Sequence, residues 1–127
     1  MGSTFLSHIT HTAQVISGTQ RGAKLGFPTL NLVIPEHFTE PFGIYAGWGT
    51  IDTVRYRGAF HYGPIPVFEK PEPSLEVFVL DTTLTTPPAE IVFEFIRKVR
   101  DIQHFPDADA LKEQIALDII LVREILR

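Results

Sequence analysis

The hydrophobic and polar positions divide the chain into a series of short alternating segments followed by one helical segment. Alternation of apolar and polar side chains is typical of strands with one buried face, and it is clearest where Ile91, Phe93 and Phe95 alternate against Glu94. Strands are predicted over residues 13–17, 29–34, 44–51, 54–62, 75–81 and 90–100. A tight turn at Asp52 and Thr53 is expected to join the third strand to the fourth.

The last segment of the chain has the periodicity of a helix. Asp107 is a suitable N-cap, and neither Gly nor Pro interrupts residues 108–127. The apolar residues that recur there at helical spacing are Leu111, Ile115, Ile119, Val122 and Leu126. Because Leu117, Ile120 and Leu121 widen this apolar face, the helix is expected to be largely buried or to cover the end of a barrel.

Strands in hairpin order followed by a terminal helix favour an antiparallel barrel or sandwich over a wound α/β sheet. Gly47 and Gly49 share one face of their strand, which indicates a close approach or a bend, as in a small barrel. The proline-rich stretch 63–73 is expected to be a long loop outside the sheet ladder. Residues 1–12 are expected to form an arm, with residues 1–3 a remnant of cloning, and 1–127 a single domain.

The amino-acid composition argues against several classes of function. A chain of 127 residues with 44% hydrophobic and 20% charged residues is typical of one globular domain. A net charge of −4 argues against a broad nucleic-acid surface, and no apolar run approaches the ~20 residues of a membrane span. The absence of cysteine excludes thiolate metal sites and fits a cytoplasmic location. His8 and His11 have no third ligand nearby and are interpreted as surface residues.

A glycine loop with local positive charge precedes the second predicted strand. Gly18, Gly22 and Gly26 let the backbone approach a ligand closely, and Arg21 and Lys24 suit a phosphate. The spacing matches neither the P-loop nor the dinucleotide-binding fingerprint. A solvated hairpin turn therefore remains the alternative.

Polar side chains follow this loop on one face of the second predicted strand. Pro28 is acceptable at the start of a strand, and Thr29 and Asn31 then share a face. Their hydroxyl and amide oxygens could hold a hard divalent ion against a phosphate, or they could form the wet side of a half-buried strand. Glu76, in an apolar strand, lies either at a solvent-exposed edge or in a cavity. Phe78 and Leu80 should share its face, which is poorly suited to water.

The stretch from Gly18 to Asn31 resembles the signature of riboflavin kinases, with Leu30 where that family has Ala. Segments 42–47, 74–81 and 97–105 resemble later family segments in the same order, so the similarity covers roughly residues 14–126. The resemblance implies a mainly β fold: a six-stranded antiparallel Greek-key β-barrel with a C-terminal α-helix packed alongside. It also implies an enzyme that converts riboflavin and ATP into FMN and ADP with Mg²⁺.

The resemblance also implies roles for individual residues. Glu76 matches the proposed base that takes the proton from the ribityl 5′-hydroxyl, and Thr29 and Asn31 match the metal ligands. The implied nucleotide-binding residues are Gly18, Arg21, Gly22, Lys24, Gly26 and Pro28. Arg100 and Phe105 are the implied flavin-binding residues. Without the resemblance, Arg100 would be interpreted as a cation at the end of a strand and Phe105 as a core aromatic residue.

Several positions depart from the family pattern. Ala23 stands where the family usually has a second Arg, Phe78 replaces a His, and residues 85–88 replace a Leu-Tyr-Gly turn. The rival hypotheses are a flavin- or nucleotide-binding protein of kinase descent without turnover, and an unrelated barrel that acts as a protein-interaction module. In many bacteria the kinase module follows an FMN adenylyltransferase domain, so the chain is expected to be a free-standing kinase or an excised module.

Overall fold

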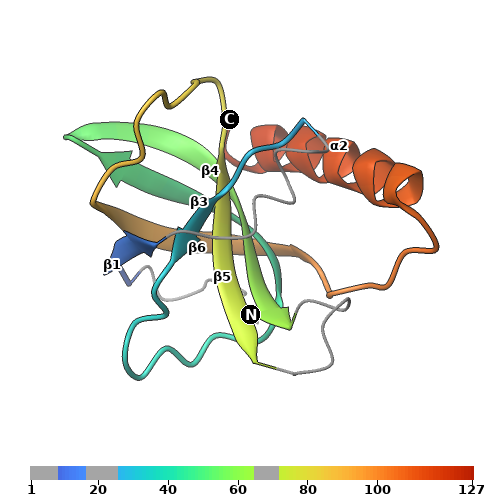
Figure 1. The fold of residues 1–127 in the computed structure, drawn as a ribbon, viewed down its shortest axis with the longest axis horizontal. Helices are drawn as coiled ribbons and strands as arrows, with labels where there is room; N and C mark the ends of the chain where they lie inside the picture. Colours follow the sequence, from blue (N-terminus) through green and yellow to red (C-terminus); the bar gives the residue numbers. More distant parts are fainter. Residues whose placement is uncertain (1–8, 17–25, 65–71) are drawn as a thin grey trace, which may run out of the picture.

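The structure of the chain is a computed structural model, and it describes residues 9–16, 26–64 and 72–127. Figure 1 shows strands that curve around a common interior, with the C-terminal helix along one side. The elements are β1 (His11–Ile16), β2 (Leu30–Leu32), β3 (Gly43–Ile51), β4 (Val54–Pro64), β5 (Pro73–Val79), β6 (Glu90–Arg100) and α2 (Ala108–Ile125). The predicted strands and the terminal helix are thereby confirmed.

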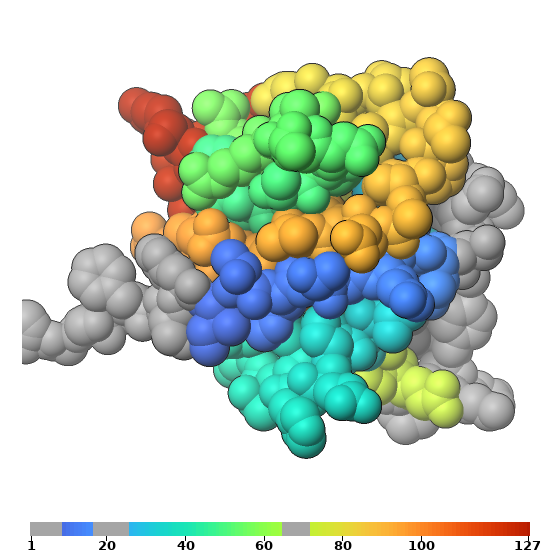
Figure 2. All heavy atoms as spheres, turned by 90° about the vertical axis from the view of Figure 1, so that its left-hand side faces the viewer, coloured from blue at the N-terminus to red at the C-terminus, as the bar shows by residue number. Residues whose placement is uncertain are grey.

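The strands form a closed antiparallel barrel in the order β1-β2-β5-β4-β3-β6. Strands β3, β4 and β5 follow one another as hairpins, and β6 returns to pair with β3, which is a Greek-key arrangement. Figure 2 shows the closing contact, in which β1 (blue) lies against β6 (orange). Of the two predicted architectures, the structure is the barrel and not the sandwich. The prediction that successive strands pair as hairpins is only partly right, because β2 pairs with β5.

Two predicted local features of β3 are confirmed. Asp52 and Thr53 have φ angles of 48° and 70°, as a two-residue hairpin of type I′ requires. At Gly47 a Cβ atom would collide with the carbonyl oxygen of Glu94 on β6, next to a register shift in the β3–β6 pairing. Only glycine therefore permits the close approach of these two strands.

The core has two parts. The barrel interior contains inward-facing residues of all strands, including a stacked pair in which the rings of Tyr45 and Phe95 lie 4.1 Å apart. Ile91 and Phe93 are fully buried there, so the alternation predicted for this strand is confirmed. A second cluster lies between the barrel wall and α2 and comprises Ala46, Leu80, Ile119, Val122 and Leu126.

Helix α2 packs through one stripe against β3, β4 and β6. It begins as predicted, because the carboxylate of Asp107 accepts a hydrogen bond of 2.8 Å from the amide of Ala110. The expectation that the helix is largely buried is wrong: Leu117, Ile120 and Leu121 are 55%, 54% and 43% exposed. A helix lying on one face of a barrel buries only a single stripe, and these three residues fall outside it.

The ends of several elements also differ from prediction. Pro64 and Pro73 pair with each other at the end of the β4–β5 ladder, where a proline removes no interior hydrogen bond. The predicted arm is too long, because β1 already begins at His11, and β2 is so short that Thr29 precedes it. Within the described ranges, no helix has the length and apolar character that crossing a membrane requires.

Candidate functional site

A cavity of about 670 Å³ lies between the outside of the barrel and α2. Its walls come from β3, β4 and β5, from the segment 102–107 between β6 and α2, and from the inner face of α2. Most of the lining is apolar, and the polar lining residues include His61, Gln103, His104 and Asp107 besides clusters in two places. One contains Thr29 and Glu76, and the other contains Arg100 and Asp118.

At the first place, strand pairing brings together residues that are distant in sequence. Glu76 on β5 lies opposite Asn31 on β2, and the hydroxyl of Thr29 donates a hydrogen bond of 2.9 Å to Oε1 of Glu76. Ser74 donates a longer bond of 3.5 Å to the other carboxylate oxygen. The structure thus brings Thr29, Asn31 and Glu76 into one cluster, of which Thr29 and Glu76 line the cavity, and we call this cluster the carboxylate end.

The surroundings of Glu76 decide between the two alternatives left open for it. Glu76 is half-buried and lines the cavity, so it is not a solvent-facing residue at a sheet edge. Phe78 lines the same cavity, and its ring meets that of Phe27 edge to face at 5.7 Å. Leu80 lies just beyond the end of β5, in the cluster beneath α2 against which Phe78 also packs, so the two residues lie on the same outer side of the barrel, as expected.

The donor set at the carboxylate end fits a magnesium ion. It offers the hydroxyl of Thr29 and the side-chain amide oxygen of Asn31, both hard oxygen ligands, beside the carboxylate of Glu76. In the described part of the chain, no group of three His, Cys, Asp or Glu side chains is placed to hold a metal. Mg²⁺ commonly keeps several waters and takes its remaining ligands from substrate phosphates, so a small protein contribution suits it.

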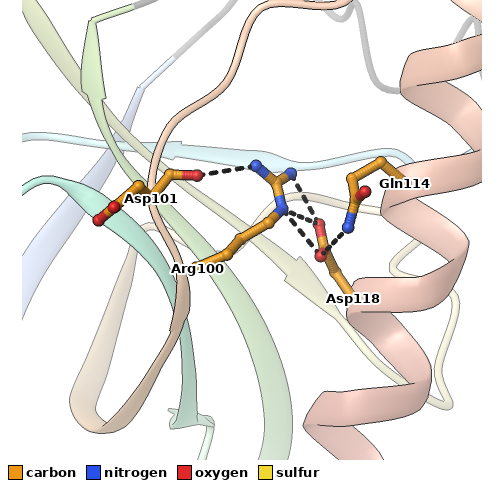
Figure 3. A network of polar contacts seen from close by, with 4 residues as sticks. All are labelled: Arg100, Asp101, Gln114 and Asp118. Atoms are coloured by element: carbon orange, nitrogen blue, oxygen red, sulfur yellow. Dashed lines mark hydrogen bonds and ion pairs between the residues drawn. The ribbon is translucent and has the colours of Figure 1, made fainter.

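At the second place, Arg100 ends β6 and faces the helix. Its Nε lies 2.9 Å from Oδ1 of Asp118, and its Nη2 lies 2.8 Å from Oδ2 (Figure 3). Gln114 donates to Asp118 as well, at 3.0 Å. The guanidinium carbon of Arg100 also lies 5.6 Å from the ring centre of Phe105, which lines the cavity and is half-buried. We call this cluster the arginine end.

Sequence analysis missed Asp118 and Gln114. The available signal was that Asp118 is an acidic residue beside Ile119 on the apolar stripe of the helix. Burying a charge at such a position costs free energy unless the charge is paired. The partner of Asp118 could not be inferred from the sequence, because Arg100 lies on another element.

Just before the segment 102–107, a hydrogen bond from Lys98 and the charge of Lys98 lower the pKa of the exposed Asp101 carboxyl.

The glycine loop is described only at its end. The predicted nucleotide-binding residues Gly18, Arg21, Gly22 and Lys24 lie outside the described residues. Gly26 and Pro28 are exposed, and Gly26 has a φ of 88°, a conformation that favours glycine. Phe27 between them lines the cavity, so the chain enters the site directly from this loop.

The model of the riboflavin kinase family (Flavokinase) matches residues 6–126. The chain belongs to this family. It is 33% identical over 108 residues to the bifunctional riboflavin kinase/FMN adenylyltransferase of Bacillus subtilis, a match that covers 82% of this chain and 34% of the relative. The corresponding Escherichia coli K12 protein is 30% identical over 117 residues, covering 89% of this chain and 36% of the relative. Against these bifunctional relatives, this riboflavin kinase family member spans about a third of the length.

Two further likenesses concern proteins with other descriptions. The RNA-binding riboflavin kinase RibR of Bacillus subtilis is 32% identical over 114 residues, covering 85% of this chain and 47% of the relative. A crystal structure described as a macrolide-efflux protein from Streptococcus pneumoniae superimposes with a TM-score of 0.81 at 25% identity. That match covers 91% of this chain and 38% of the other chain, and it supports the barrel-and-helix fold of the family member.

Proposed function

We propose that the chain transfers the γ-phosphoryl group of ATP to the 5′-hydroxyl of riboflavin, giving FMN and ADP. The observation that carries this proposal is the carboxylate end of the cavity, where Glu76 accepts a hydrogen bond from Thr29 and lies opposite Asn31. A carboxylate that could take a proton therefore adjoins oxygens that could hold a phosphate-bound metal. Family membership supports the same reaction.

Phosphoryl transfer requires mainly positioning and charge neutralisation, with a base for the proton of the attacking hydroxyl. We assign the base to Glu76, which lines the cavity. A bond forms between the ribityl oxygen and the γ-phosphorus, the bond from that phosphorus to the ADP oxygen breaks, and the proton passes to the carboxylate. Thr29 and Asn31 would hold Mg²⁺, which supplies neutralisation of phosphate charge when bound.

The two substrates are assigned to different parts of the site. The flavin ring would occupy the apolar cavity towards Phe105, whose ring offers a stacking surface. Arg100 belongs to the same wall through its contact with that ring. The phosphates would lie at the glycine loop, with the nucleotide-binding residues Gly18, Arg21, Gly22, Lys24, Gly26 and Pro28.

Several wider predictions stay predictions. These are a single domain over residues 1–127, a cytoplasmic location, and an FMN adenylyltransferase domain in a longer native chain. The prediction that no nucleic acid binds is also open, since RibR carries an RNA-binding description.

The test is incubation of the protein with riboflavin and MgATP, followed by chromatographic detection of FMN and ADP. We expect the two products in equal amounts and their loss when a chelator removes the metal. Tight riboflavin binding without FMN would favour the rival of a flavin-binding protein without turnover. No binding of riboflavin, FMN or ADP would favour the interaction module.

A further inference from the structure

Asp118 is an unusual residue for its position. Its exposed fraction is 3%, and it is the only charged or polar residue counted as buried in the described part of the chain. It lies beside Ile119 on the stripe of α2 that packs against the barrel. An apolar pair of similar volume at such a position is often as stabilising as a buried ion pair, so stability alone does not account for an aspartate here.

The contacts of Asp118 fix the orientation of Arg100. The carboxylate receives both Nε and Nη2 of the guanidinium, and Gln114 holds Oδ1 from the preceding helical turn. The remaining Nη1 donates a hydrogen bond of 3.0 Å to the carbonyl of Asp101. Figure 3 shows the guanidinium held between the helix on one side and the chain leaving β6 on the other.

These contacts secure the segment that forms one wall of the cavity. Residues 102–107 all line the cavity, and they connect β6, where Arg100 lies, to α2, where Asp118 lies. Arg100 contacts the beginning of the segment through the Asp101 carbonyl and its middle through the ring of Phe105. One guanidinium therefore ties together the strand end, the wall segment and the helix.

We infer that Asp118 is a positioning residue: acting through Arg100, it holds segment 102–107 in the shape that accepts the flavin ring. The inference rests on the proposed function for the identity of the ligand. It assigns Asp118 to flavin affinity, and not to the phosphoryl-transfer step at the carboxylate end.

The chain offers a matched control for this role. Arg123 near the end of α2 donates bonds of 2.6 and 2.7 Å to Asp81, so a second Asp–Arg pair ties the same helix to the barrel region. The side chains of Arg123 and Asp81 are 45% and 52% exposed, whereas those of Arg100 and Asp118 are 14% and 4% exposed. Neither Arg123 nor Asp81 lines the cavity.

The experiment compares Asp118→Asn, Arg123→Gln and the double variant Arg100→Met/Asp118→Leu with wild type. The double variant keeps the buried volume without the charges, so it should remain folded. We expect Asp118→Asn and the double variant to weaken riboflavin binding, measured by flavin fluorescence, about tenfold or more, the range of a lost charge-assisted hydrogen bond. MgADP affinity measured without flavin should stay within about twofold, and Arg123→Gln should change neither affinity.

Amide hydrogen exchange of residues 102–107 in the ligand-free protein provides a second readout that does not depend on the ligand. Exchange should accelerate in Asp118→Asn and the double variant but not in Arg123→Gln. A folded double variant with wild-type riboflavin affinity, or unchanged exchange in this segment, would overturn the inference. If wild type itself binds no riboflavin, the proposed function fails, while the exchange comparison still decides whether Asp118 positions the wall.

Discussion

The two polar ends of the cavity are built in different ways. At the carboxylate end, Glu76, Thr29 and Asn31 come from paired strands of the barrel, and the side chains are half-buried. At the arginine end, a buried ion pair joins the end of β6 to α2. Groups that must meet a reacting atom with fixed geometry are placed more precisely on strands than on loops. The loop segment 102–107 at the arginine end is held by side-chain contacts instead. The comparison predicts that damage at the first end lowers turnover and damage at the second lowers flavin affinity.

The largest effect is expected from Glu76→Gln, which breaks the carboxylate end. The change is close to isosteric but removes the proposed base, so kcat should fall by ~10²–10⁴. Riboflavin and MgADP affinities should remain near wild type, as calorimetry can check. A rate within about threefold of wild type would mean that Glu76 is not the base.

The next effect concerns the proposed metal ligands at the same end. Asn31→Leu should weaken MgADP binding roughly tenfold, because a lost hydrogen bond or ligand at such a site is worth ~1–2 kcal/mol, while metal-free ADP binding should hardly change. Thr29→Val should do the same and also lower kcat, since Thr29 donates to Glu76. Equal losses with and without Mg²⁺ in calorimetry would mean that the two residues are structural.

A smaller effect is expected at the arginine end from Phe105→Ala. Loss of an aromatic contact of about 0.5–1.5 kcal/mol should raise the riboflavin KM roughly 2–10-fold, with kcat at saturating riboflavin unchanged. Phe42→Ala is the control, because Phe42 is 46% exposed and does not line the cavity. If kcat falls instead of KM rising, the division between the two ends is wrong.

The smallest effect is a gain. Ala23 stands outside the described residues, at the loop position where the riboflavin kinase pattern usually has a second Arg. Ala23→Arg should tighten MgADP binding by about 1 kcal/mol, the net value of a charge-assisted hydrogen bond, and leave riboflavin affinity without nucleotide unchanged. An unchanged or weaker MgADP affinity would argue that this loop does not close over phosphate.

The two ends also differ in how far the sequence alone could predict them. Thr29, Asn31 and Glu76 each stand in a short recognisable pattern. Strand periodicity correctly placed Asn31 and Glu76 on the face opposite Leu32 and Val77 of the core, whereas Thr29 lies before β2. Their meeting depended on the β2–β5 pairing, which a sequence read as successive hairpins does not reveal. The Arg100–Asp118 pair joins two elements 18 residues apart, and neither residue's partner is visible in local periodicity. The exposed Leu117, Ile120 and Leu121 mislead for a related reason, because apolar composition does not tell which helix face meets the barrel.

The central claim is that the carboxylate end determines turnover and the arginine end determines flavin affinity. Its most direct test is to measure the steady-state kinetics of Glu76→Gln and Asp118→Asn side by side, with riboflavin as the varied substrate. Glu76→Gln is predicted to lower kcat by at least ~10² with little change in riboflavin KM, and Asp118→Asn to raise riboflavin KM about tenfold with kcat within about threefold. The contradicting result is the same parameter moving in both variants, which would mean that the cavity acts as one undivided site.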